Sequence, residues 1–308
     1  MNKSCTISKI TLGTVQLGLN YGVANKSGQP SIDYSHKLLQ FALDNGINTL
    51  DTARIYGNAE DVIGSFKNSN EFTIVSKFKL TDAAVGDIKL AIAEARESIQ
   101  TSCRLLNRKQ LPIVLFHKNM SQPIEQVTDL LPVVFSALIN EGLIEKGGIS
   151  VYCAHELHQI LEWENMNYIQ VPVNVFDTRI LQKNILQQLE QQNVIVFARS
   201  VYLQGLLAMK EPLPDSLSFA TPYYKQLRKI AAKANRSIKE IAFSFVRDTP
   251  CVNSIVVGAE TIEQLCQNIE LLGTPPLSKE IYDEIKECFG NVPDEIITPA
   301  LWKNKITQ

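Results

Sequence analysis

The sequence predicts an α/β protein folded as a single (β/α)8 TIM barrel over residues 1–308. Short β-branched runs alternate with amphipathic segments along nearly the whole chain, which is typical of repeated βα units around a parallel sheet. Eight such runs occur, which is the number that a closed barrel uses. No linker rich in Pro, Gly or Ser interrupts the series, so one domain is expected.

The eight expected strands are short and rich in β-branched residues. They are residues 7–13, 47–51, 72–78, 113–117, 146–150, 168–171, 194–200 and 253–258. Apolar residues at helical spacing predict helices over 88–99 and 127–138. Ser31 and Thr261 are start signals for the first and last barrel helices, and Gly46 is a stop signal for the first.

Two segments do not fit the alternating pattern. Residues 209–224 contain three prolines and are expected to form a surface loop over the barrel mouth. The tail after Phe289 contains further prolines and Trp302, and we expect it to fold back across the same mouth.

The composition, 45% hydrophobic and 20% charged, is that of a globular protein with a large core. The net charge is −2 and the basic residues are scattered, so no nucleic-acid partner is expected. No apolar run reaches the roughly 18 residues of a membrane span, and the N-terminus lacks a signal-peptide pattern, so we expect a cytoplasmic protein without a membrane segment. The oligomeric state stays open.

The six cysteines are far apart and form no CxxC pair, which indicates reduced, mostly buried thiols. Cys153, His155 and His158 lie close together in the sequence, but their spacing fits no familiar zinc pattern. No metal site is expected.

Polar residues stand at or near the ends of six expected strands. They are Asp51, Lys77, His117, Ser150, Gln170 and Ser200. Taken singly, each has an ordinary explanation, such as a helix cap, an exposed strand end or a buried imidazole. In a barrel the carboxyl ends of the strands converge on one site. Asp51, Lys77 and His117 would then share a small space in which a buried lysine needs a carboxylate partner.

The loop after the second expected strand reads Asp51-Thr-Ala-Arg-Ile-Tyr56-Gly57 and returns Tyr56 to the neighbourhood of Asp51. A phenol has an unperturbed pKa of about 10, and a nearby ammonium group lowers it by stabilising the phenolate. We therefore expect Asp51, Tyr56, Lys77 and His117 to form a proton-transfer unit in which the pKa of Tyr56 is lowered.

These segments resemble the aldo-keto reductase superfamily. The resemblance is carried by Gly13-Thr14, the 51–57 loop, Ser76-Lys77 and Leu115-Phe116-His117, which match the family's catalytic tetrad in order and spacing. It runs from about residue 9 to residue 269 through the similar segments 148–150, 170–174, 200–207 and 257–268.

The resemblance implies an NAD(P)H-dependent oxidoreductase that interconverts a small carbonyl compound (an aldehyde, ketone or sugar) and the alcohol. Tyr56 would be the proton donor or acceptor, Lys77 held by Asp51 would lower its pKa, and His117 would orient the carbonyl. The implied cofactor is NADP(H), with NAD(H) possible, and the family binds it without the GxGxxG motif that this sequence lacks. The cofactor-binding residues would be Gly13, Thr14, Asp51, Ser150, Gln170, Arg199, Ser200, Leu203, Gly205, Gly258, Gln264 and Asn268.

Two departures from the family pattern concern the cofactor. Ser150 is followed by Val151 where the family usually has Asn, so Ser150 and Gln170 would hold the nicotinamide carboxamide alone. Residues 258–264 contain no cation, and Glu260 would repel a 2′-phosphate. The preference for NADP over NAD is therefore expected to be weak.

A third departure is Arg199, which stands where the family commonly places an aromatic ring against the nicotinamide. A planar guanidinium can stack in that slot, where its charge would disfavour the oxidised, cationic cofactor. Alternatively, Asp177 neutralises Arg199, or Arg199 turns outward to meet an anionic substrate or the cofactor pyrophosphate, with Arg54 nearby.

Two other functions remain open at this stage. One is a non-catalytic dinucleotide-binding regulatory or sensor protein of the same fold. The other is a Schiff-base barrel enzyme in which Lys77 attacks a carbonyl. The complete four-residue set favours the oxidoreductase.

Overall fold

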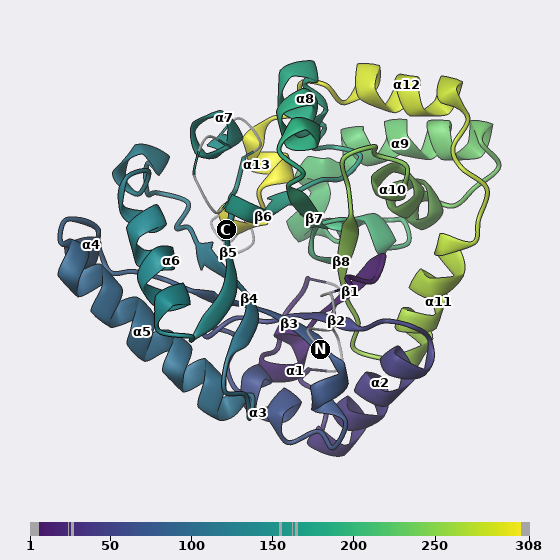
Figure 1. Cartoon of the computed structure of the whole chain (residues 1–308). Coiled ribbons are helices and arrows are strands. Elements are labelled where there is room, and N and C mark those ends of the chain that lie inside the picture. Colours follow the sequence, from purple (N-terminus) through teal and green to yellow (C-terminus); the bar gives the residue numbers. More distant parts are fainter. Residues whose placement is uncertain are drawn as a thin grey trace.

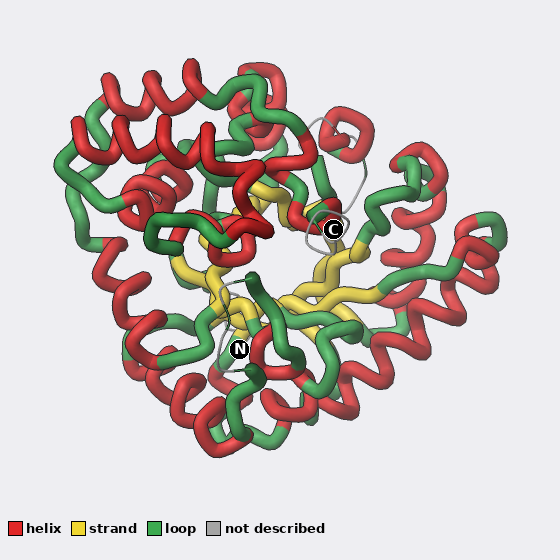
Figure 2. Tube along the Cα trace, turned by 180° about the vertical axis from the view of Figure 1, so that it is seen from behind, coloured by secondary structure: helices red, strands yellow, loops and turns green. Residues whose placement is uncertain are grey.

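The computed structural model describes residues 6–23, 25, 28–153, 156–161, 163 and 166–302 of the chain. Eight parallel strands close into a barrel in the order β1 to β8, and the helices surround it (Figures 1 and 2). The strands are β1 (Ile10–Gly13), β2 (Thr49–Asp51), β3 (Thr73–Phe78), β4 (Leu111–His117), β5 (Ile144–Ser150), β6 (Met166–Pro172), β7 (Ile195–Arg199) and β8 (Ser254–Gly258). The predicted (β/α)8 barrel is confirmed.

The α-helices range from single turns to five turns. They are α1 (Val15–Gly18), α2 (Ile32–Asp44), α3 (Ala59–Gly64), α4 (Asp82–Val85), α5 (Ile88–Leu105), α6 (Leu130–Asn140), α7 (Leu157–Ile160), α8 (Lys183–Gln191), α9 (Thr221–Lys233), α10 (Ile238–Arg247), α11 (Ile262–Leu272), α12 (Lys279–Cys288) and α13 (Asp294–Ile297). Short 3-10 helices include η5 (Leu203–Ala208) and η6 (Asp215–Ala220).

The helix boundaries follow from capping residues. Ser31 caps α2 by accepting a hydrogen bond from the backbone of Tyr34, and Thr261 caps α11 in the same way. Gly46 follows α2 with φ of +77°, a conformation that favours glycine. The expected helix signals at these three positions are confirmed.

Some expected bounds differ from the structure. The first strand begins at Ile10, three residues later than predicted, and Val127 precedes α6 instead of lying within it. Two helices, α9 and α10, separate β7 from β8, and α12 follows the last barrel helix.

The prediction that residues 209–224 form a loop over the barrel mouth is wrong. Much of this segment is helical, because it contains η6 and the start of α9, where Pro222 occupies the first turn. Proline lacks an N–H that the first turn would leave unpaired in any case, so it starts this helix instead of breaking it. None of these residues lines the cavity described below.

The tail does return to the barrel mouth, as expected. Trp302 is buried, its ring packs edge-on against Phe219 at a centroid distance of 5.7 Å, and its Nε1 donates to the Glu295 carbonyl oxygen. This anchor brings residues 297–300 against the cavity.

The barrel interior is filled by Val75, Ile113, Leu115, Tyr168 and Phe197, which form their own apolar cluster. A much larger cluster lies between the strands and the surrounding helices. This packing makes the barrel a solid support for the polar residues at its carboxyl end.

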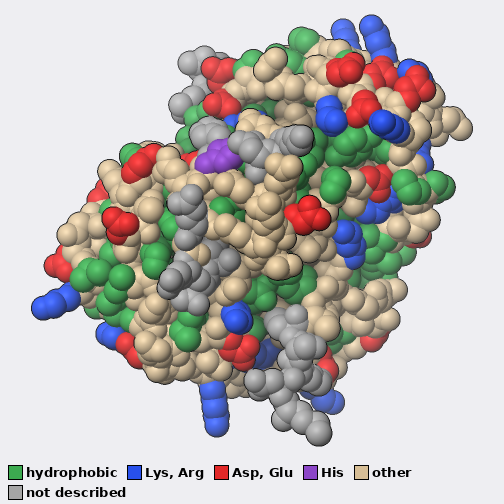
Figure 3. Space-filling view, turned by 45° about the horizontal axis from the view of Figure 1, so that its top comes forward, with side chains coloured by type: hydrophobic (Ala, Val, Ile, Leu, Met, Phe, Trp, Pro, Cys, Tyr) green, Lys and Arg blue, Asp and Glu red, His purple; other side chains and the backbone are tan. Residues whose placement is uncertain are grey.

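Acidic and basic side chains are interspersed over the face shown in Figure 3. Among the described residues, no helix is long and apolar enough to cross a membrane.

Candidate active site

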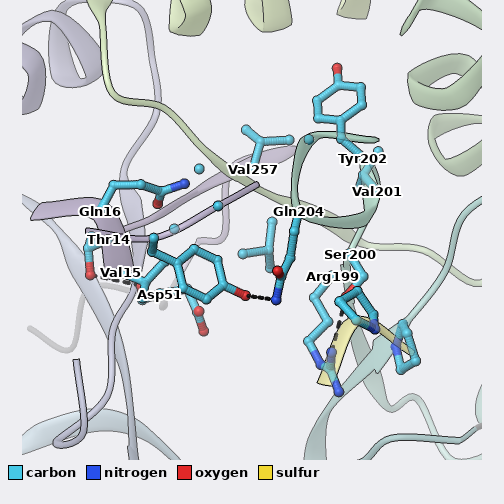
Figure 4. Close-up of a pocket in the computed structure, with 18 of the residues that line it drawn as sticks. Thr14, Val15, Gln16, Asp51, Arg199, Ser200, Val201, Tyr202, Gln204 and Val257 are labelled. Carbon is cyan, nitrogen blue, oxygen red and sulfur yellow. Dashed lines mark hydrogen bonds between the residues drawn. The ribbon is translucent and has the colours of Figure 1, made fainter. Parts of the chain in front are cut away.

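The carboxyl ends of the strands surround a cavity of about 590 Å³. Three of the four predicted catalytic residues, Asp51, Tyr56 and His117, line it. Figure 4 shows its two sides, with Thr14, Val15, Gln16 and Asp51 facing the end of β7 and the loop that follows it. A small molecule in this cavity would meet polar groups on both sides.

Lys77 lies behind the cavity lining, against Asp51 and Tyr56, and is 1% exposed. Its Nζ donates to Asp51 Oδ1 at 2.6 Å and to the Thr52 carbonyl oxygen at 2.9 Å, and it lies 3.5 Å from Tyr56 Oη. Burial lowers the pKa of Lys77, whereas the charge and hydrogen bond of Asp51 raise it. The expected pairing of Lys77 with Asp51, in reach of Tyr56, is present in the structure.

Two glycines set the position of Tyr56. A Cβ atom on Gly18 would lie 1.9 Å from the Tyr56 carbonyl oxygen, and one on Gly57 would lie 2.2 Å from the Gly18 carbonyl oxygen. Any side chain at either position would push α1 and the Tyr56 loop apart. The Gly18–Gly57 contact therefore holds the phenol over Lys77.

A buried carboxylate anchors the same loop from behind. Glu60 is 1% exposed and accepts hydrogen bonds from Ser76 Oγ at 2.7 Å, Ser102 Oγ at 3.0 Å and Arg54 Nη1 at 3.2 Å. Arg54 thus pairs with Glu60 and does not line the cavity. The suggestion that Arg54 joins Arg199 around an anion is wrong.

His117 presents a neutral imidazole to the cavity. Burial, followed by the charges of Lys77, Lys79 and Arg199, lowers its pKa to about 2. Its Nδ1 is buried without a hydrogen-bond partner among the described residues. A neutral imidazole carries one N–H, and we assign this proton to Nε2, which can then donate to a substrate oxygen. The His117 and Tyr56 rings meet edge to face with centroids 6.3 Å apart. The two side chains can therefore act on one substrate oxygen.

The expected lowering of the Tyr56 pKa is wrong for this structure. Burial, and then the negative charge of Asp51, raise the pKa of Tyr56 well above its usual value. Desolvation of the phenolate outweighs the nearby ammonium group because Asp51 offsets much of the charge of Lys77. Tyr56 is therefore a protonated phenol at neutral pH, which is the form that donates a proton.

Ser150 and Gln170 lie together beside Asp51. Ser150 Oγ donates to Gln170 Oε1 at 3.1 Å, and Gln170 Nε2 donates to Asp51 Oδ1 at 2.6 Å. Both side chains line the cavity and are nearly fully buried. They form a continuous polar floor with the Lys77–Asp51 pair, which the sequence alone did not predict.

Most of the other residues expected to bind the cofactor also line the cavity. Those in place are Gly13, Thr14, Ser200, Gly205, Gly258, Gln264 and Asn268. Leu203 instead lies fully buried under the loop after β7. Ser200, Leu203 and Gln204 have φ between +46° and +62°, so this loop holds a strained conformation that the surrounding packing maintains.

One buried polar group in the cavity is suited to contact a polar ligand such as a dinucleotide. Gln16 Oε1 is buried and has no hydrogen-bond partner in the described part of the chain. The Gln16 side chain packs on Gly258, where a Cβ atom would lie 2.3 Å from Gln16 Nε2. Buried polar atoms are normally paired. This unpaired oxygen and the narrow cradle at Gly258 indicate a site for a polar ligand.

Arg199 does not pair with Asp177, because Asp177 accepts two hydrogen bonds from Arg179 at 2.7 Å each. The guanidinium of Arg199 instead lies over the Tyr152 ring, with its central carbon 5.0 Å from the ring centroid. The suggested neutralisation by Asp177 is wrong, whereas stacking on a nicotinamide stays a prediction.

Several residues that line the cavity were not predicted from the sequence, among them Tyr21, Tyr152, Gln204 and Lys239. Gln204 Nε2 donates to Tyr21 Oη at 3.0 Å, which links the loops after β1 and β7. Tyr152 follows β5, and Lys239 lies in the first turn of α10, where its Nζ donates to Gln267 Oε1 at 2.6 Å. Ser237 and Glu240 form a capping box, so the start of α10 was readable from the sequence even though its place at the cavity was not.

Glu260, Gln264 and Lys239 all line the cavity. Gln264 Nε2 donates to Glu260 Oε2 at 3.2 Å. Burial lowers the pKa of Lys239, and the charge of Glu270 raises it. The cavity therefore contains a cation that the 258–264 segment lacks, and it comes from α10.

The sequence cluster Cys153, His155 and His158 cannot be placed as a unit, because His155 lies outside the described residues. His158 Nδ1 lies 3.2 Å from Gln188 Oε1. In the described part of the chain, no group of three or more His, Cys, Asp or Glu residues is arranged to hold a metal ion.

A closed barrel with a Lys–Asp pair under a phenol and a neutral imidazole defines an acid–base site suited to carbonyl chemistry. The Aldo/keto reductase family profile matches residues 9–289. The chain therefore belongs to the aldo/keto reductase family and is an NAD(P)H-dependent oxidoreductase of that type.

Two curated relatives illustrate the range of similar proteins. The chain is 26% identical to an uncharacterized oxidoreductase of Bacillus subtilis, over 94% of each chain. It is 24% identical to a putative voltage-gated potassium channel subunit beta of Schizosaccharomyces pombe, over 86% of this chain and 87% of that one.

Solved structures share the fold at low identity. An aldo-keto reductase from Bacillus halodurans, in its holo form, superimposes with a TM-score of 0.72 at 20% identity and covers 94% of this chain and 95% of its own. An aldo/keto reductase from Klebsiella pneumoniae in complex with NADP and acetate has a TM-score of 0.68 at 20% identity, over 93% of each chain.

Proposed function

We propose that the protein reduces the carbonyl group of a small aldehyde, ketone or sugar-like compound to the alcohol, with Tyr56 as the proton donor. The observation that carries this proposal is the Lys77–Asp51 ion pair 3.5 Å beneath the Tyr56 hydroxyl, at the base of a cavity. The bound dinucleotide supplies the hydride in this direction. Every other requirement falls on side chains of this chain.

Each residue has a separate task. Tyr56 Oη donates its proton to the substrate oxygen, which becomes the alcohol, and Lys77 stabilises the resulting phenolate. Asp51 keeps Lys77 charged and in place. His117 is neutral, so it orients the carbonyl through one N–H without adding a charge. In the oxidative direction the Tyr56 phenolate accepts the proton.

We assign the cofactor to the side of the cavity lined by Thr14, Gly258 and Asn268, with Ser150 and Gln170 toward its nicotinamide end. NADP(H) is the proposed cofactor, and NAD(H) is expected to bind as well. Glu260 disfavours a 2′-phosphate, whereas Lys239 favours one. These opposed charges support the prediction of a weak preference. The reaction depends on Tyr56, Lys77, Asp51 and His117. The other residues assigned to the dinucleotide position the cofactor.

The test is a turnover assay with a broad panel of aldehydes, ketones and sugars, following loss of NADPH and NADH absorbance. The proposal predicts reduction of at least one class of carbonyl. Binding of NADPH without turnover of any carbonyl would contradict it.

A second candidate function is a regulatory dinucleotide sensor. It is favoured by the similarity to a putative potassium channel subunit beta, and it would give cofactor binding without turnover. A Schiff-base reaction at Lys77 is not supported, because Lys77 is 1% exposed, pairs with Asp51 and does not line the cavity.

A further inference from the structure

Among the residues that line the cavity, Arg199 and Lys239 are the cations, and the proton transfer proposed above uses neither. Arg199 ends β7 (Figure 4). It lines the cavity together with Tyr56 and His117. Among the described residues, no acid forms an ion pair with it. Two acids near this end of the barrel are already engaged, Asp51 by Lys77 and Asp177 by Arg179.

The Arg199 side chain is held in place while much of its hydrogen-bonding capacity is free. Nη2 donates to the Val151 carbonyl oxygen at 2.8 Å, and Nη1 donates to Ser200 Oγ at 3.1 Å. A guanidinium has five N–H groups, and these two bonds use two of them. The Tyr152 ring supports one face, with its centroid 5.0 Å from the guanidinium carbon.

A guanidinium fixed in this way is suited to bind an anion. Its planar fork matches the oxygens of a carboxylate or phosphate. A half-buried cation without a counter-ion also pays a desolvation cost that an arriving anion offsets. The charge is close enough to the tetrad to act on it, because it is among the causes, after burial and two lysines, that lower the pKa of His117.

We propose that Arg199, supported by Tyr152, binds an anionic group of the substrate, a carboxylate or a phosphate, so that the preferred substrates are anionic carbonyl compounds. This inference rests on the proposed carbonyl reduction and adds the class of substrate. An anion held at Arg199 fixes one end of the substrate, and the carbonyl at the other end meets Tyr56 and His117. The orientation comes from the anion, so neutral analogues bind in more ways and react more slowly.

The experiment compares matched substrates that differ in one anionic group. The carboxylate pair is succinic semialdehyde and butanal, and the phosphate pair is glyceraldehyde 3-phosphate and glyceraldehyde. Wild-type kcat/KM is expected to favour the anionic member of at least one pair, and the pair with the larger ratio identifies the anion. Equal kcat/KM values within both pairs would overturn the proposal.

Substitution at Arg199 tests whether this residue is the cause. Arg199→Met should reduce the ratio of anionic to neutral kcat/KM by about tenfold to a hundredfold, which is the effect of losing a charged hydrogen bond. Arg199→Lys keeps the charge but loses the fork, so its ratio should lie between those of wild type and Arg199→Met. A ratio unchanged in Arg199→Met would overturn the proposal, and so would an effect that appears only as weaker binding of NADPH and NADH.

Lys79→Met is the matched control. Lys79 is also a cation whose charge acts on His117, but its Nζ donates to Asn119 Oδ1 at 2.8 Å and it does not line the cavity. Its removal should change the substrate ratio by less than about threefold, since only a direct contact contributes a charged hydrogen bond. A loss equal to that of Arg199→Met would show that the general field, and not an anion contact, sets the ratio.

A binding measurement separates this proposal from the reduction itself. Calorimetry on the NADPH-loaded protein with succinate and with 1,4-butanediol requires no turnover. The proposal predicts that succinate binds more tightly to wild type than to Arg199→Met, whereas 1,4-butanediol binds equally to the two proteins. No turnover of any carbonyl would reject the proposed reaction, whereas equal succinate binding by the two proteins would reject the anion site.

Discussion

Removal of the Lys77 charge should raise the pH at which Tyr56 accepts a proton in alcohol oxidation. The Lys77 Nζ and Tyr56 Oη atoms lie 3.5 Å apart, so the attraction between ammonium and phenolate is about 4.7 kcal/mol at an effective dielectric constant of about 20. At about 1.36 kcal/mol per pH unit this corresponds to at most about 3.5 units. Asp51 opposes the effect of Lys77 on the phenolate, so we expect Lys77→Met to raise the oxidation limb by about 1 unit or more.

The assay is kcat/KM for alcohol oxidation between pH 6 and pH 10 in wild type and Lys77→Met. Lys77→Arg, which keeps a positive charge, is the control and should move the limb less. Because Lys77→Met leaves Asp51 buried without its partner, at a cost of about 3–5 kcal/mol, the double variant Asp51→Asn/Lys77→Met provides a second measurement with neither charge. If folded, cofactor-binding Lys77→Met enzyme keeps the wild-type pH profile, Lys77 does not act on Tyr56.

Two further predictions concern His117 and cofactor choice. The pKa of His117 is about 2 in the folded protein and about 6.5 in the unfolded chain, so the unfolded chain binds the proton more tightly. The stability that neutral His117 contributes is therefore fully present above about pH 6.5 and is lost as the pH falls toward 2. Between pH 7.5 and pH 5, wild type should therefore lose about 2 kcal/mol more unfolding free energy than His117→Gln in urea titrations, and equal losses would refute this pKa shift. For the cofactor, wild-type dissociation constants for NADPH and NADH should differ by less than about a hundredfold, or about 2.7 kcal/mol. Glu260→Gln should strengthen NADPH binding about two- to fivefold with little change in NADH binding. Lys239→Met should weaken NADPH binding instead. If each variant changes the binding of both cofactors equally, neither residue faces a 2′-phosphate.

The sequence predicted the barrel and most of the candidate site because both depend on local patterns. Asp51, Lys77 and His117 stand at or near the carboxyl ends of their strands, and these ends converge once the barrel closes. The short segment from Asp51 to Tyr56 indicated that Tyr56 returns to the neighbourhood of Asp51, and the Gly18–Gly57 contact explains why this loop is tight.

The errors concern contacts between segments that are distant in the sequence. Burial of Tyr56 outweighs the ammonium group and reverses the expected pKa shift. Arg199 lies on Tyr152, from a different strand end, and not against Asp177. Lys239 lies on α10, the second of the two helices between β7 and β8. No periodic pattern in the sequence predicts that its side chain lines the cavity.

The central claim, that Tyr56 transfers the proton, is tested most directly by Tyr56→Phe. In the described part of the chain, the Tyr56 hydroxyl accepts a hydrogen bond from Lys77 Nζ at 3.5 Å, and the variant removes it. The account predicts that carbonyl reduction falls by about 10² to 10⁴, while the dissociation constant of NADPH stays within about twofold of wild type. A rate within about tenfold of wild type in Tyr56→Phe, with substrate saturating, would contradict it.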